Sequence, residues 1–186
     1  CAAFCQAADR YGLLALPGME LTCREEVHVV CLFPDLPSAQ AFGELVRQKL
    51  PPLENDPRFF GPQLLMDSED HSLGEETALL AGAADIGIYE AAELVRGYGG
   101  AAYPAHIDRD SFSVLSNLGF WDPAMGFSLA ELSPRCPPEL RLRPDLAGLR
   151  FLTGCDAHYL DQIPDPTQRM ELPERTPPAV LEWLFF

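Results

Sequence analysis

The sequence predicts an α/β fold in which short buried strands alternate with amphipathic helices. Near-continuous apolar runs of strand length recur, and Glu26–Phe33 is typical of a strand buried on both faces. Segments with helical spacing lie between these runs, as in Ile88–Tyr98, where Ala91 and Val95 fall on one apolar face. This alternation implies parallel strands with helices outside, and in (β/α) barrels functional side chains collect at the C-terminal ends of the strands.

The N-terminal half contains four further expected elements. They are a helix from Ala2 to about Tyr11, a strand at Leu13–Leu16, a helix from Ser38 to about Leu50 and a surface β-hairpin at about 61–75. Ser38 can cap the second helix with its hydroxyl, and the prolines after Leu50 end it.

The C-terminal half continues the pattern, and we expect the whole chain, residues 1–186, to form a single domain. Gly99 and Gly100 end the helix at Ile88–Tyr98. The expected elements are strands at Ala101–Ala105, Phe127–Leu132 and Leu149–Thr153, a short helix at Ser111–Leu118 capped by Asp110 or Ser111, and a terminal helix at Val180–Leu184.

The overall composition is that of an ordinary globular protein, with 47% hydrophobic and 22% charged residues. A net charge of −15 argues against an extended contact with nucleic-acid phosphates, which needs clustered Lys and Arg. We therefore expect a small phosphorylated substrate and no duplex nucleic acid. The six cysteines form no CxxC pair, and neither a signal peptide nor an apolar run of membrane length is present. These features predict reduced thiols in a cytoplasmic protein that does not bind membranes.

Five potential metal ligands fall at the ends of short apolar runs: Glu20, His28, His106, Asp156 and His158. Carboxylates and imidazoles held at several strand ends are what a hydrolytic metal site needs. Taken singly, the residues have ordinary alternatives, since Glu20 could be a surface carboxylate and His28 a hydrogen-bonded core histidine. The Asp156-x-His158 pair is more specific, because alternate residues of an extended segment point the same way.

Four strings that contain these ligands resemble the PHP family, the polymerase and histidinol phosphatase domains. They are Pro17-Gly18-Met19-Glu20, Glu26-Val27-His28-Val29, Tyr103-Pro104-Ala105-His106 and Cys155-Asp156-Ala157-His158. The resemblance implies a distorted (β/α)7 TIM-like barrel whose strand ends bind a divalent metal cluster of zinc, manganese or iron. It also implies a metal-dependent phosphoesterase, in which a metal-activated water attacks a phosphate ester of a small metabolite or nucleotide.

The resemblance further implies individual roles. Glu20 would bridge two metals, His28 and His106 would bind one of them, and Asp156 and His158 would close the cluster, with no catalytic residue separate from the ligands. PHP domains begin with a His-x-His strand, a further His and a Thr-Asp-His, and none of these is present here. We therefore expect a truncated barrel that lacks its first strand or strands, and a chain that is inactive alone.

Two residues outside the ligand set can contribute to the same site. Arg109 could direct its guanidinium at substrate phosphate, or form a surface ion pair with Asp108 or Asp110. Glu131, inside an apolar strand, would need a partner for its buried carboxylate. The alternative to an enzyme is a non-catalytic PHP module with a scaffold or regulatory role. A metal-dependent amidohydrolase fits the order of motifs less well, because no lysine is placed to bridge metals.

Overall fold

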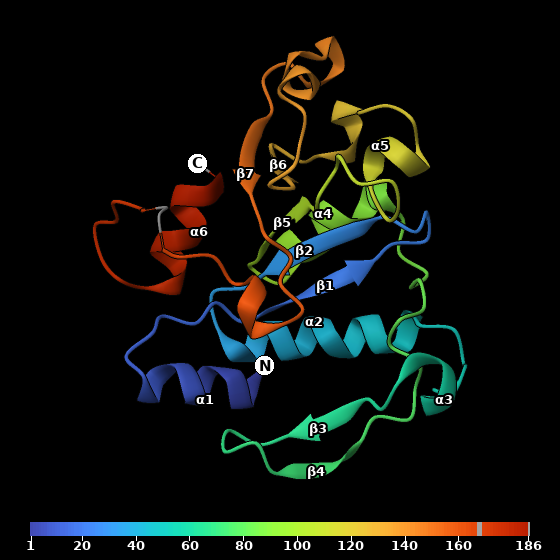
Figure 1. Cartoon of the computed structure of the whole chain (residues 1–186), viewed down its shortest axis with the longest axis vertical. Helices are drawn as coiled ribbons and strands as arrows, with labels where there is room; N and C mark the ends of the chain where they lie inside the picture. The colour runs from blue at the N-terminus through green and yellow to red at the C-terminus, as the bar shows by residue number, and fades with distance from the viewer. Residues whose placement is uncertain (167–168, 186) are drawn as a thin grey trace.

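A computed structural model gives the structure of residues 1–166 and 169–185. Its centre is a three-stranded antiparallel sheet in the order β1 (Gly18–Thr22), β2 (His28–Leu32) and β5 (Ala101–Pro104). A second pair, β6 (Leu129–Leu132) and β7 (Arg150–Thr153), is parallel. The two sheets are joined after β5, where the Ile107 amide donates to the Glu131 carbonyl at 2.9 Å, so the strands form one open, curved surface (Figure 1).

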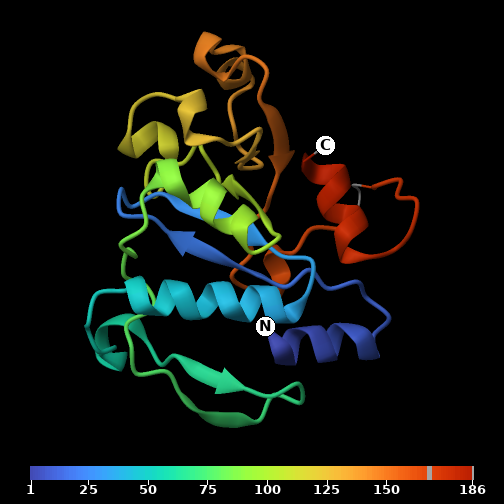
Figure 2. The ribbon, with the colours of Figure 1, turned by 180° about the vertical axis from the view of Figure 1, so that it is seen from behind.

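Two helices cover one face of this surface (Figure 2). They are α2 (Leu36–Lys49) and α4 (Ile88–Gly97), and the main hydrophobic core lies between them and the strands. Val29 and Cys31 of β2 are fully buried there, in the same apolar cluster as Phe42 of α2. The opposite face carries a smaller apolar cluster with α6 (Pro177–Phe185). The first helix, α1 (Ala2–Arg10), lies near one end of α2 (Figure 1).

A β-hairpin lies alongside α2 in both views of the ribbon, formed by β3 (Leu64–Met66) and β4 (Ser72–Glu75). Gln63 anchors its base: the amide nitrogen donates to the carbonyls of Glu76 and Ala78, and the amide oxygen accepts from the backbone of Leu80 at 2.9 Å. The remaining short elements of residues 1–166 and 169–185 are α3 (Pro57–Phe60), α5 (Val114–Asn117) and four 3₁₀ turns, η1 (Pro123–Met125), η2 (Pro138–Leu142), η3 (Pro144–Leu146) and η4 (Leu160–Gln162).

The mixed α/β class is confirmed, but a closed barrel is absent from the described residues. The strand predicted at Leu13–Leu16 does not form, and the first strand is instead β1. Among the strands of the described residues only β6 and β7 pair in parallel, so the general expectation of parallel strands is wrong. For β1 and β2 the reason is their short connecting turn, closed by the Cys23 amide on the Val27 carbonyl, because a parallel crossover needs a dozen or more residues.

The predicted N-terminal caps are also corrected. The α2 cap is Asp35, whose carboxylate accepts from the Ser38 amide at 2.8 Å, and the α5 cap is Ser113 rather than Asp110 or Ser111. No helix in the described part of the chain is long and apolar enough to cross a membrane. All six cysteines are free thiols.

Candidate metal centre

Glu20 and His28 project from the sheet face opposite the helices. Thr22 pairs with His28, and Glu20 pairs with Val30. Since alternate residues of a strand share a face, Glu20, His28 and Val30 lie together, while Val29 points into the helical core. Glu20 is thus the diagonal neighbour of His28 across the antiparallel pair, within reach of its side chain. The sequence predicted that Glu20 follows a strand, but Glu20 lies within β1.

His106 joins these two residues from the segment after β5. Oε1 of Glu20 lies 3.4 Å from Nδ1 of His28 and 3.7 Å from Nε2 of His106. Ligand atoms of the three residues all lie within 4.8 Å of one another. Two ligand atoms bound at about 2.1 Å to a tetrahedral ion are about 3.4 Å apart, so the spacing fits one shared divalent cation.

The backbone at His106 turns its imidazole toward Glu20. Tyr103 lies on the face opposite the helices, and strict alternation would place Ile107 on that face too. Ile107 is instead buried in the helical core, because His106 has a φ of 28° and shifts the alternation by one residue. Non-glycine residues with positive φ are uncommon and cluster at functional sites, and Asp156, with a φ of 45°, is another.

The electrostatics of the three residues favour cation binding. The hydrogen bond to His106, then that to His28, lowers the pKa of Glu20 to about 2, although burial opposes the shift. Glu20 therefore carries its negative charge at any physiological pH. His106 is only 3% exposed, and its buried Nδ1 has no hydrogen-bond partner among the described residues. Such orphaned atoms are rare in folded proteins, and an ordered water is an ordinary partner for this nitrogen, because the other ring nitrogen, Nε2, is the one that faces Glu20.

Asp156 and His158 are not part of this close group. Within the described residues, they form a neighbouring cluster after β7, in which Nε2 of His158 lies 3.4 Å from Asp156. Arg109 also binds Asp156, at 2.6 Å. Arg109 therefore forms an ion pair, but its partner is Asp156 and not Asp108 or Asp110 as the sequence suggested. Asp108 instead accepts two hydrogen bonds from Ser133.

Glu131 connects the two clusters. It lies in β6, only 8% exposed, and burial raises the pKa of its carboxyl group. The charges of Glu20 and Asp156 reinforce this rise, whereas His106 and Arg109 oppose it, so all four are electrostatic neighbours. The sequence had predicted that Glu131 needs a partner, because it lies within an apolar strand.

Phe112 is a site residue that the sequence did not indicate. Its ring stacks on His28 with centroids 4.7 Å apart and planes 18° apart. Its carbonyl accepts the His28 amide at 3.0 Å, and its φ is 52°. A lone aromatic residue in a serine-containing loop carries no spacing signal that would have distinguished it.

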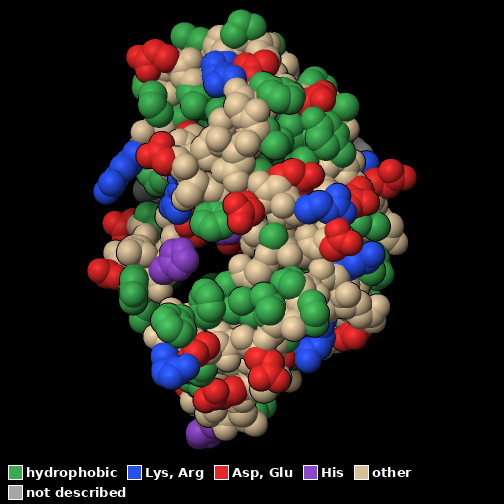
Figure 3. Space-filling model, turned by 90° about the vertical axis from the view of Figure 1, so that its right-hand side faces the viewer, with side chains coloured by type: hydrophobic (Ala, Val, Ile, Leu, Met, Phe, Trp, Pro, Cys, Tyr) green, Lys and Arg blue, Asp and Glu red, His purple; other side chains and the backbone are tan. Residues whose placement is uncertain are grey.

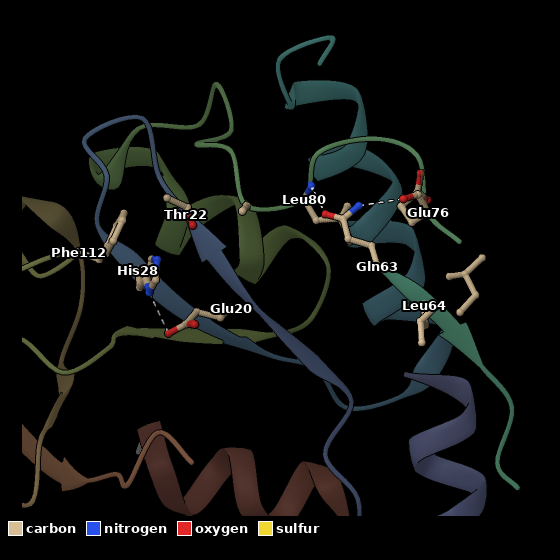
Figure 4. Close-up of a pocket in the computed structure, with 10 residues that line it drawn as sticks. Glu20, Thr22, His28, Gln63, Leu64, Glu76, Leu80 and Phe112 are labelled. Atoms are coloured by element: carbon tan, nitrogen blue, oxygen red, sulfur yellow. Dashed lines mark hydrogen bonds and ion pairs between the residues drawn. The ribbon is translucent and has the colours of Figure 1, made fainter. Parts of the chain in front are cut away.

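A cavity of about 600 Å³ opens beside two of the candidate ligands, Glu20 and His28. Figure 3 shows a hollow with histidine at its edge and a band of hydrophobic side chains along one side. In Figure 4, Glu20, His28 and Phe112 lie across the cavity from the base of the hairpin. Its lining comprises Glu20, Thr22, His28, Gln63, Leu64, Leu65, Glu76, Leu80, Ala81 and Phe112.

No protein-family model and no curated protein sequence matches the chain. Among solved structures, it is similar to the lesion-specific endonuclease PfuEndoQ from Pyrococcus furiosus, with a TM-score of 0.53 and 18% sequence identity. The match covers 76% of this chain but only 30% of that protein. The chain thus shares part of the fold of a hydrolase, while membership of the PHP family and the identity of the metal stay predictions.

This neighbour overturns the predicted partners. A small phosphorylated substrate and no duplex nucleic acid were expected from the net charge of −15. The protein with the similar fold is an endonuclease, and endonucleases act on nucleic acid. Net charge is an average over the whole surface, and it does not describe the local field at a site that can hold cations.

Proposed function

We propose that the chain contributes a divalent-metal centre of the PHP type that hydrolyses phosphodiester bonds in nucleic acid. The observation that carries the proposal is the close group of Glu20, His28 and His106, whose ligand atoms are spaced for one cation. The fold shared with an endonuclease supports the nucleic-acid substrate. Zinc, manganese and iron all accept this mixture of imidazole and carboxylate ligands.

The residues would divide the work as follows. The metal would be held by the carboxylate of Glu20, whose pKa is about 2, and by the imidazoles of His28 and His106. When bound, a divalent metal lowers the pKa of its water and stabilises charge on the phosphoryl oxygens. Asp156 and His158 would bind a further ion or orient groups next to that ion. Glu131 of β6 would hold the neighbouring side chains of both clusters in place.

Arg109 is proposed to contact the substrate phosphate. Its side chain is 40% exposed although it binds Asp156. A guanidinium has five N–H donors, so pairing with one carboxylate leaves others for a phosphate oxygen. The same contact would fix the orientation of Asp156, which makes Arg109 a link between substrate and ligand cluster.

The proposal is tested by nuclease assays on the full-length protein with single- and double-stranded oligonucleotides in the presence of manganese or zinc. We expect cleavage that chelation with EDTA abolishes. His106→Ala should lower turnover by more than about 100-fold, since even outer-shell changes at metal sites cost 10- to 100-fold.

The matched control is His71→Ala, because His71 is an exposed histidine in the hairpin turn, where it pairs with Asp67. Circular dichroism establishes that both variants are folded. Full activity in His106→Ala, or cleavage that is indifferent to EDTA, would contradict the proposed centre. Absence of cleavage in the wild-type protein that retains metal would favour the non-catalytic module.

A further inference from the structure

Phe112 combines exposure with a fixed position at the edge of the candidate centre. One side of its ring packs on His28, yet 42% of the residue is exposed and it lines the cavity. An exposed aromatic ring beside a cavity retains surface on which a second planar group can stack.

The loop around Phe112 is held in place from both sides. The Phe112 carbonyl accepts from the His28 amide at 3.0 Å, and the Ser113 hydroxyl donates to the Arg109 carbonyl at 2.7 Å. Phe112 has a φ of 52°, a conformation that is costly for a bulky residue. Strained backbone persists where surrounding contacts fix it, and here those contacts fix an aromatic ring at the site.

The cavity next to Phe112 is suited to a neutral, flat group rather than to a phosphate. Leu64, Leu65 and Leu80 provide apolar walls from the hairpin side. The carboxylates on its lining are Glu20 and Glu76, of which Glu76 is already paired with Arg47. A second anion would be repelled there, whereas an uncharged aromatic ring would gain apolar contact.

The Gln63 amide has no N–H donor left for a ligand in this cavity, because both of its N–H groups are used at the base of the hairpin. Its nitrogen donates to two backbone carbonyls, and its oxygen accepts from the Leu80 amide. Away from Glu20, Thr22, His28 and Glu76, the contact surface is therefore apolar and aromatic, which favours binding by stacking in that part of the cavity.

We propose that Phe112 is a stacking platform for one base of a nucleic-acid substrate, with that base lodged in the cavity beside the metal centre. The inference rests on the proposed function and adds a substrate-positioning residue to it. Because Phe112 touches His28, the phosphate next to the stacked base would lie close to Glu20 and His28. A base held in this way would place one phosphodiester at the centre.

The test is equilibrium binding of a fluorescein-labelled, phosphorothioate-protected oligodeoxythymidylate to the metal-loaded full-length protein, measured by fluorescence anisotropy. Phe112→Leu keeps an apolar side chain but removes the ring, and it should weaken binding by about 5- to 100-fold. Phe112→Trp should restore the affinity. An abasic chain of the same length should bind the wild-type protein and Phe112→Leu equally well.

Phe120→Leu is the matched control, since Phe120 is an exposed aromatic residue outside the cavity lining. Metal content is measured for every variant, because Phe112 also packs on His28. Unchanged affinity in Phe112→Leu would overturn the platform while leaving the proposed function intact. An equal loss on the abasic chain, or a loss of metal, would mean that Phe112 only supports His28. If the wild-type protein binds neither chain, the nucleic-acid function falls, and the platform with it.

Discussion

His106 reaches Glu20 because the backbone leaves its strand geometry at one position. Glu20, His28 and His106, which the ligand strings in the sequence singled out, lie together in the structure. The sequence could not predict the φ of 28° at His106, since hydrophobic alternation carries no signal for a single residue that interrupts it. Nor could the sequence predict the role of Phe112, because only tertiary packing places its ring on His28.

Gly154 shows how closely the site is packed at the residue scale. A Cβ at this position would overlap the carboxylate of Glu131, so Gly154→Ala must displace that side chain. We expect a loss of about 1–3 kcal/mol in the free energy of unfolding by urea. In the double variant Gly154→Ala/Glu131→Ala the overlap is gone, and the two losses should sum to more than the measured total. Strict additivity of the two losses would contradict this packing.

At the scale of elements, the sequence predicted types better than boundaries or pairing. The helices at the start, middle and end of the chain and the hairpin follow from apolar spacing and from Pro and Gly punctuation. The strand expected at Leu13–Leu16 is wrong, because apolar composition alone does not supply a pairing partner. Leu14 and Leu16 instead contribute to the second apolar cluster without forming a strand.

The turn at η3 depends on a charged contact that the sequence did not reveal. Asp145 binds the guanidinium of Arg143 at 2.8 Å and accepts from the Trp121 amide at 3.0 Å. The contact with Arg143, followed by the Trp121 amide, lowers the pKa of Asp145 from 3.8 to about 2. Asp145 thereby joins the loop before η1 to the segment leading to β7.

This contact predicts a pH-dependent stability difference. A carboxyl group whose pKa is lowered by folding stabilises the protein above its unfolded pKa, and the contribution disappears as the pH falls through the folded pKa. Asp145→Asn should therefore destabilise the protein by about 1 kcal/mol near neutral pH, after allowance for solvent screening. The difference from wild type should shrink between about pH 4 and pH 2 in urea titrations. A difference that stays constant to pH 2 would contradict the assignment, and Asp161→Asn, at an exposed aspartate, is the control.

For the whole molecule, the sequence predicted the fold class but not the way in which its strands assemble. A short turn pairs β1 with β2, and β5 pairs with β2 from far along the chain; both pairings are antiparallel, which local patterns of hydrophobicity do not distinguish from parallel pairing. The same limit applies to charge: 28 acidic and 13 basic residues describe the surface as a whole. Under the proposed function, substrate affinity would come from bound cations and stacking, both of which need few Lys or Arg side chains.

The proposed function requires that Glu20 and its two histidine neighbours hold a metal ion. The decisive measurement is the dissociation constant for zinc, by competition with a chromophoric chelator, in the wild-type protein, Glu20→Gln and His71→Ala. Glu20→Gln keeps the shape of the side chain but removes the charge that the pKa of about 2 preserves. We expect at least a tenfold weaker affinity for Glu20→Gln and no change for His71→Ala, since loss of one ligand is felt by the whole coordination shell. Equal affinities for wild type and Glu20→Gln would contradict the candidate metal centre.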